Sequence, residues 1–383
     1  MEDPCARQSD YYDLLLANSS SWNQSCDYAN LLGAGQRIET GDRAYFTARV
    51  FIGVALVCIM LVCGVGNVLF IFTLVRYRKL RKVTNLLIAN LAVSDLIVAV
   101  VCCPFEMDYY VIRELSWTYG QLMCSAVNYL RTVSLYVSTN ALLAIAVDRY
   151  LVIVYPLKPR MTLQTACCVL AGVWLFSLLV ALPSAYFTTQ TMFGSFQEAP
   201  GVTNHKIYCV QIWTADKALL YKSYFLFLFA VEFLLPIGAM SCCYIRICRE
   251  LWFKDLPGVQ TEQLRGRLRA RRKTVLVLVG VLVTYVLCWA PYYGYSLVRD
   301  FFPSVLLKVT HSVSVFYVVE CIAMSNSLIN TVFFILVKNN TGKYVKKILL
   351  QRWKSSQETD RITLECHSSL PPCSESAAVQ TPR

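Results

Sequence analysis

The stretch ALLAIAVDRYLVIVYPLK, residues 141–158, places an acid and a base side by side at the end of an otherwise apolar run. The polar residues are Asp148, Arg149 and Tyr150. A charge in hydrocarbon costs several kcal/mol, so the presence of two charged residues here requires an explanation. Taken by themselves, they fit two readings equally: an arginine that snorkels to a membrane surface beside its counter-ion, or a pair with a functional role.

Further ionisable residues lie within apolar runs. Glu106 follows Asp95 by about three helical turns, so the two share a face. Glu106, Arg131, Arg299 and Glu320 fall toward the same end of their runs and are hard to explain as lipid-facing. Internal salt bridges, for example Arg131 to Glu320, are one reading, and a polar ligand pocket is the other; the two are compatible.

The elements that position these residues are membrane spans. The chain has 383 residues, of which 56% are apolar and 16% charged. Apolar runs of about 20 residues, enough to cross the hydrocarbon as a helix, recur near 50–75, 86–110, 122–147, 166–186, 222–245, 274–298 and 311–337. Helix is expected even in runs rich in Val, Ile and Phe, because in lipid each segment must form its backbone hydrogen bonds within itself. The predicted fold class is an all-α integral membrane protein with a seven-transmembrane helix bundle.

The distribution of Lys and Arg predicts the orientation. The segments 76–84, 149–160, 246–273 and 338–354 carry most of these residues and are therefore predicted to be cytoplasmic, which leaves the N-terminus extracellular. Glycosylation acceptors at Asn18 and Asn23 agree with this, although Asn339 matches the same pattern on the cytoplasmic side. The net charge of +12 then reflects contact with anionic membrane lipid and needs no nucleic acid.

Most of the 17 cysteines lie in apolar spans, where a thiol is a small hydrophobe. Cys124 and Cys209 are the cysteines of the outer loops between spans, and both face an oxidising compartment. We therefore expect a disulfide between them. Cys5 and Cys26 are candidates for a second one.

About 37 Å of helix separates Cys124 from Arg149, so Arg149 lies at the cytoplasmic mouth of the third span. The other spans carry, in order, Asn67, Asp95, Trp174 with Pro183, Pro236 with Tyr244, CWAP at 288–291 and SNSLINT at 325–331. This set resembles the rhodopsin-like class of G-protein-coupled receptors from about residue 50 to 350. Longer stretches such as CCPFEMDYYV, TEQLRGRLRARRKTVLVL and FYVVECIAMSNS are similar to the prokineticin receptors.

The resemblance implies partners and a location. The ligands would be prokineticins, small secreted disulfide-rich proteins, and the transducer a heterotrimeric G protein, chiefly of the Gq type, with phospholipase C activation and calcium release. Arrestin and receptor kinases would act on a cytoplasmic tail at the plasma membrane.

Two related receptor classes do not fit this sequence. Amine receptors have an aspartate at the position of Arg131, and opsins have a lysine in the seventh span, which residues 311–337 lack. Another peptide ligand, of the neuropeptide Y or tachykinin kind, remains the alternative.

The resemblance also implies two sets of working residues. A hydrated sodium pocket would use Asp95, Ser138, Asn326 and Asn330, and the alternative is a protonated Asp95 hydrogen-bonded to Asn67 or Asn326. In the second set, Pro291 kinks the sixth span beside the toggle Trp289, and an outward swing uncovers Arg149, which Asp148 restrains at rest. The residues assigned to coupling and activation are Asp148, Arg149, Tyr150, Tyr244, Trp289, Pro291 and Asn330.

Two departures from the class pattern affect this set. No acid occurs between Glu262 and Asp300, so Arg149 cannot form a salt bridge with the sixth span; Asp148 and a hydrogen bond to Thr274 are the remaining restraints. The seventh span also reads NTVFF, without the usual proline and tyrosine, so a tyrosine contact to Tyr244 cannot form.

Enzyme classes lack support, since no nucleophile, base and orienter set, phosphate loop or metal spacing appears. A transporter or channel would need an internal repeat and several buried acids, whereas we expect Asp95 to be the only acid deep in a span.

The predicted organisation is an extracellular tail over 1–48, the bundle over 49–338, an amphipathic cytoplasmic helix over 339–354 and a disordered cytoplasmic tail over 355–383.

Overall fold

The computed structural model describes residues 43–192, 196–199, 202–204, 207–211, 218–253, 262–302, 305 and 312–333. Several predicted features lie outside these residues. They are the glycosylation acceptors Asn18 and Asn23, the cysteines Cys5 and Cys26, the amphipathic helix over 339–354 and the tail over 355–383.

In the described residues, seven helical spans are long and apolar enough to cross a membrane, which confirms the predicted seven-helix bundle. Five are single helices: α3 (Arg43–Arg76), α6 (Gly120–Val154), α7 (Leu163–Phe187), α10 (Glu262–Phe301) and α12 (Ser312–Val332). The second span consists of α4 (Val83–Ile97), η2 (Val98–Cys102), α5 (Cys103–Met107) and η3 (Asp108–Ile112). The fifth consists of α8 (Ala218–Leu228), η5 (Phe229–Leu234), α9 (Leu235–Cys248) and η6 (Arg249–Phe253). The sixth is α10 (Glu262–Phe301), and a short turn, η1 (Arg78–Leu80), follows α3.

The sixth helix is longer than hydropathy predicts. The apolar run begins near residue 274, but α10 begins at Glu262 and carries the basic stretch RGRLRARRK as helix. Hydropathy identifies only the part of a helix that lies in lipid. The helix extends beyond that part into water, because Leu, Arg and Ala have a high helix propensity. The helix also continues through Pro291.

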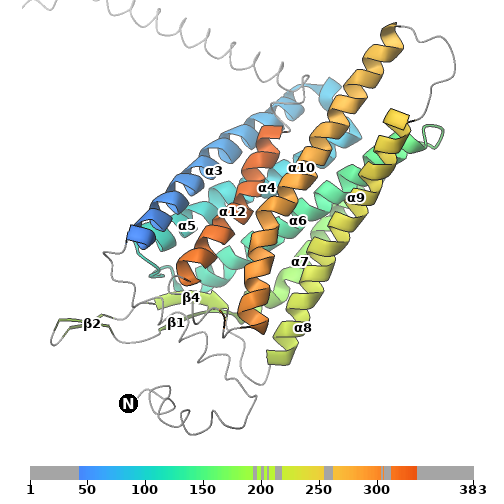
Figure 1. Ribbon diagram of the computed structural model, residues 1–383. Helices are drawn as coiled ribbons and strands as arrows, with labels where there is room; N and C mark the ends of the chain where they lie inside the picture. Colours follow the sequence, from blue (N-terminus) through green and yellow to red (C-terminus); the bar gives the residue numbers. More distant parts are fainter. Residues whose placement is uncertain are drawn as a thin grey trace, which may run out of the picture. The chain divides into compact units, whose positions relative to one another are not determined.

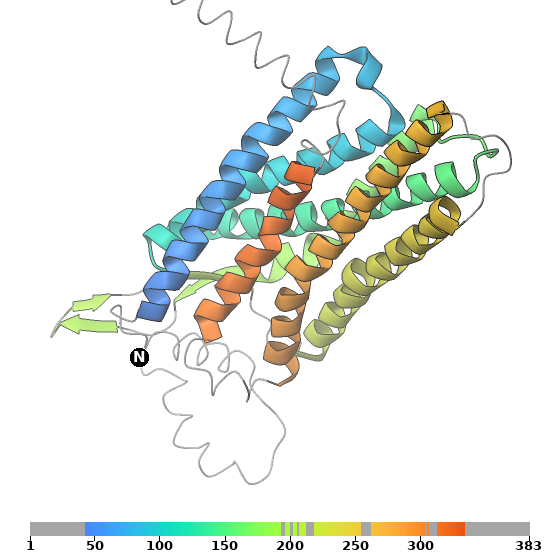
Figure 2. The same cartoon turned by 45° about the horizontal axis from the view of Figure 1, so that its top comes forward.

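The helices pack around α6, which contacts α4, α7 and α9. α3 lies against α4 and α12, and α10 lies against α9 and α12, so the ring closes (Figures 1 and 2). The core between them is apolar, with Leu91, Ile145 and Tyr285 fully buried. Apolar side chains such as Leu61 and Leu175 point outward and are 61% exposed, as expected for helices whose outer faces meet lipid.

Two small antiparallel sheets lie in the segment between α7 and α8, where the sequence analysis expected only a loop. β1 (Thr188–Met192) pairs with β4 (Ile207–Gln211), and β2 (Phe196–Ala199) pairs with β3 (Val202–Asn204). Outside lipid, β-branched residues in TTQTM and IYCVQ favour strands. The β1–β4 pair lies at the end of the bundle where α6 begins (Figure 1). We name this the Cys124 end, and the opposite end the Arg149 end.

Candidate functional site

A disulfide anchors the β1–β4 pair to the bundle. Cys124, at the start of α6, is bonded to Cys209 of β4 with an S–S distance of 1.99 Å, which confirms the predicted bridge. The carbonyl of Thr188, the first residue of β1, accepts hydrogen bonds from Gln121 and Ser125 of α6. The strands are therefore held over the Cys124 end of the bundle.

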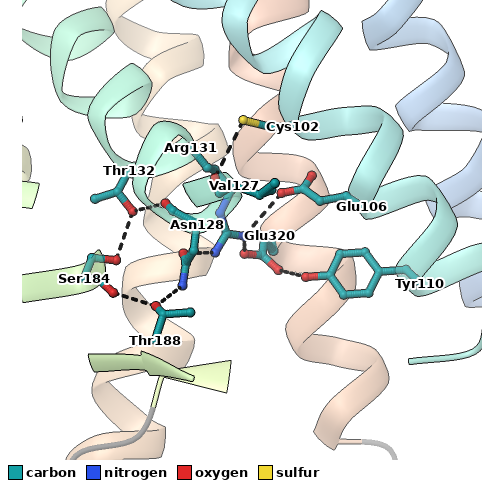
Figure 3. Close-up of polar contacts among 10 residues, drawn as sticks. All are labelled: Cys102, Glu106, Tyr110, Val127, Asn128, Arg131, Thr132, Ser184, Thr188 and Glu320. Carbon is teal, nitrogen blue, oxygen red and sulfur yellow. Dashed lines mark hydrogen bonds and ion pairs between the residues drawn. The ribbon is translucent and has the colours of Figure 1, made fainter. Parts of the chain in front are cut away.

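On the side of the strands that faces the bundle, a buried charge cluster joins three spans (Figure 3). Arg131 of α6 forms an ion pair with Glu320 of α12, and its Nη1 lies 3.6 Å from Oε1 of Glu106 in α5. Tyr110 donates to Glu320 at 2.9 Å, and Asn128 accepts from Arg131 at 2.9 Å. The Glu106 and Glu320 side chains are only 7% and 5% exposed. The predicted ion pair of Arg131 and Glu320 is thus present.

The cluster contains two carboxyl groups and one guanidinium. Glu106 and Glu320 share one guanidinium, that of Arg131. Among the described atoms, Oε2 of Glu106 has no hydrogen-bond partner. A second cation, brought from outside, would find an acceptor already in place, because a buried carboxylate is stabilised chiefly by a paired charge.

A cavity of about 70 Å³ lies directly beside the cluster. Its lining brings together residues from three predicted groups: Arg131 and Glu320 from the ligand set, Trp289 from the activation set, and Ser138 and Asn326 from the sodium set. Trp289, which the sequence analysis predicted as the toggle, therefore lines the same cavity as Arg131 and Glu320.

Arg299 is placed apart from this cavity. Its guanidinium bonds Asp300 at 2.7 Å and the hydroxyl of Tyr221 at 2.8 Å, and it lies 5.7 Å from the ring centroid of Phe316. It does not line the cavity beside Arg131. The structure therefore separates one predicted ligand residue from the other three.

Asp95 lies deeper and is almost fully buried, at 1% exposure. Ser138 donates to its Oδ1 at 3.2 Å, and Ser327 adds a second side-chain hydrogen bond. Asn67 donates to Thr331 rather than to Asp95. The oxygens of Asn326 and Asn330 have no partner among the described atoms. Asp95 and Asn330 line one small cavity, whereas Ser138 and Asn326 line the cavity beside Arg131. Carboxylate, hydroxyl and amide oxygens are the ligand types that suit a hard monovalent cation such as sodium.

At the Arg149 end, the guanidinium of Arg149 is held by its neighbour and by α4. Its Nη2 lies 2.5 Å from Oδ2 of Asp148 and also donates to the hydroxyl of Thr84. Thr84 in turn donates to Asp148 at 3.2 Å. Thr274, which the sequence analysis named as a further restraint, instead donates to the carbonyl of Ala270 in its own helix. That candidate is corrected to Thr84, because a threonine within a helix readily bonds its own i−4 carbonyl.

Two tyrosines complete this end of the bundle. Tyr150 packs edge-to-face on Tyr155, with ring centroids 5.7 Å apart. Tyr244 of α9 is buried. Leu157 follows α6 and is 99% exposed.

Comparison with known proteins agrees with this arrangement. The model of the 7 transmembrane receptor (rhodopsin family) matches residues 66–333. The chain belongs to this family. Among relatives, Prokineticin receptor 1 of Bos taurus is 63% identical over 317 residues, 83% of this chain and 79% of the relative. Prokineticin receptor 2 of Homo sapiens is 60% identical over 341 residues, 89% of this chain and 88% of the relative. The chain therefore groups with the prokineticin receptors, and since the family consists of receptors, the expectation of a non-enzyme is confirmed.

Three residues of this receptor were missed by the sequence analysis. Glu232 in the fifth span is 1% exposed, so Asp95 is not the only acid deep in a span, and that expectation is wrong. The signal was visible as the lone acid in FLFLFAVEFLLP. Thr84 and Leu157 gave no signal, because a threonine or a leucine near a span end is ordinary in composition.

Proposed function

We propose that this chain is a plasma-membrane receptor for prokineticins, small secreted disulfide-rich proteins, and that it couples mainly to Gq, with phospholipase C activation and calcium release. The names of the relatives support the ligand class. The observation that carries the proposal is the buried cluster of Glu106, Arg131 and Glu320 beside an open cavity. A ligand that inserts a positively charged amino group there meets the surplus carboxylate.

The orientation follows from the same chemistry. The Cys124 end is extracellular, because it holds the disulfide and faces an oxidising compartment. The Arg149 end is cytoplasmic, because the basic segments cluster there. The glycosylated tail over 1–48 then lies outside the cell. The helix over 339–354 and the tail over 355–383 lie inside, available to receptor kinases and arrestin.

Activation transmits a change at the cavity to the Arg149 end. The ligand displaces Trp289, and the half of α10 on the Arg149 side of Pro291 swings outward. The swing opens a cleft in which Arg149 exchanges Asp148 and Thr84 for the C-terminal helix of the Gα subunit. In the resting state Asp95, Ser138, Asn326 and Asn330 would supply the oxygen ligands for a sodium ion.

The test is a calcium recording in cells that express the full chain. Prokineticins should raise calcium, whereas neuropeptide Y and tachykinin peptides should not. The Arg149→Ala variant should reach the surface and bind ligand normally but give no calcium signal, because it lacks the guanidinium that meets the G protein. A response only to an unrelated peptide would overturn the ligand assignment, and undiminished calcium release from Arg149→Ala would overturn the role of that residue.

A further inference from the structure

A line of hydrogen bonds leads from the charge cluster to the strands at the Cys124 end (Figure 3). Nη2 of Arg131 donates to the side-chain oxygen of Asn128 at 2.9 Å, and the side-chain nitrogen of Asn128 donates to the hydroxyl of Thr188 at 2.7 Å. The Thr188 hydroxyl in turn donates to the carbonyl of Ser184 at 2.5 Å. Groups from α6, α7 and β1 are therefore joined in one line, with Asn128 in the middle.

The chemistry of these groups leaves one arrangement. A guanidinium only donates, so the oxygen of the Asn128 amide faces Arg131 and its NH₂ group faces Thr188. A hydroxyl has one proton, and that of Thr188 goes to the Ser184 carbonyl, so Thr188 must accept from Asn128. Donors and acceptors alternate along the whole line, and the members of such a line polarise and strengthen one another. Thr188 is 1% exposed, so water does not compete for its hydroxyl.

Thr188 is the residue at which the chain passes from helix to strand. It is the C-cap of α7 and the first residue of β1, which pairs with β4 along its whole length. Its carbonyl accepts from Gln121 at 2.9 Å and from Ser125 at 3.1 Å. A shift of Thr188 therefore moves the start of the strand pair, while Cys209 of β4 stays tied to Cys124 by the disulfide.

Three side chains of α6 bond Thr188, and they differ in what else they contact. In the described part of the chain, Asn128 is the one that also bonds Arg131. Gln121 instead accepts from the backbone amide of Gln190 in β1 at 2.7 Å. The Arg131 guanidinium is paired with the acids of the cluster. A change in its position therefore reaches the strands through Asn128.

From this geometry we infer that Asn128 is a positioning residue that couples the charge cluster to the β1–β4 strand pair. While Arg131 lies between Glu106 and Glu320, Asn128 holds the Thr188 hydroxyl and keeps the start of β1 in place. A cation that draws either acid away from Arg131 shifts the guanidinium and loosens this hold. Because coupling between two sites is reciprocal, the position of the strands also sets how readily such a cation enters. The ligand's part in this rests on the proposed function, whereas the coupling itself exists without any ligand.

The test is a double-variant cycle in the purified full-length receptor without ligand, measured as amide hydrogen exchange of residues 188–192. Asn128→Leu should speed exchange of this segment about fivefold, since a buried hydroxyl loses its donor. Arg131→Met should speed it by a similar factor. The two changes together should exceed either one by less than about twofold, because both break the same line. If Arg131→Met alone is not recovered, Arg131→Met with Glu320→Gln replaces it, since one uncompensated acid is then removed as well.

Gln121→Met is the matched control, because it removes another bond to Thr188 on the side away from Arg131. Alone it should also speed exchange of the segment, and with Arg131→Met the two fold-changes should multiply. Three results would each overturn the inference: unchanged exchange in Asn128→Leu, fold-changes that multiply for Asn128→Leu with Arg131→Met, or fold-changes that fail to multiply for Gln121→Met with Arg131→Met. Because no prokineticin is used, a failed ligand assignment would leave this result unaffected.

Discussion

The buried charge cluster makes a quantitative prediction for Arg131→Met. Methionine has a similar length but no charge, so the substitution leaves Glu106 and Glu320, at 7% and 5% exposure, without a cation. Removing one partner of a buried ion pair costs about 3–5 kcal/mol. The entropy of unfolding is about 2.1 cal/mol/K per residue, so in a bundle of roughly 290 residues about 1 kcal/mol shifts Tm by about 1.6 °C. For Arg131→Met, Tm should therefore fall by about 5–8 °C.

The assay is thermal unfolding of the purified receptor with a thiol-reactive fluorescent dye. The described residues offer buried thiols that react only on unfolding: Cys63, Cys102, Cys103, Cys288 and Cys321. The double variant Arg131→Met with Glu320→Gln should recover part of the loss, because one of the two uncompensated carboxylates is gone. If Arg131→Met melts within about 2 °C of the unmodified receptor, the cluster is not a buried ion pair and the reasoning fails.

Three further predictions concern the two ends of the bundle. Thr84→Ala should raise basal signalling by about two- to tenfold, since Arg149 loses one hydrogen-bond acceptor, and unchanged basal calcium would contradict this. Leu157→Asp should lower G-protein activation at least tenfold with normal ligand binding, because Leu157 is 99% exposed and burying a leucine side chain against a partner is worth about 1.5–3 kcal/mol; full activation would exclude that contact. Cys124→Ser should destabilise the receptor by about 2–4 kcal/mol and lower surface delivery or ligand binding, measured with an extracellular epitope tag and labelled ligand. Surface levels and binding like those of the unmodified receptor would show that the bridge to Cys209 is dispensable.

The amino-acid sequence by itself determined the spans, and it did so for a physical reason. In lipid, each segment must satisfy its own backbone, so an apolar run of sufficient length is a helix whatever its neighbours are. The predicted span 166–186 corresponds to the observed Leu163–Phe187 for this reason. The disulfide was also predictable, because Cys124 and Cys209 were the cysteines of the outer loops.

Only the tertiary structure decided which polar groups meet. Arg131 and Arg299 looked equivalent in sequence, yet the first lies between two acids and the second pairs with its neighbour Asp300. Thr84, far from Arg149 in the chain, turned out to hold its guanidinium.

The hydrogen bond from Tyr285 to Glu232 shows this division most clearly. Both residues are visible in the sequence, but only the packing of α10 against the fifth span places the Tyr285 hydroxyl 2.9 Å from the Glu232 carbonyl, 53 residues away in the chain. Hydropathy determines that a helix crosses the membrane, whereas its rotation and tilt, which follow from packing against its neighbours, determine which side chains it presents to them.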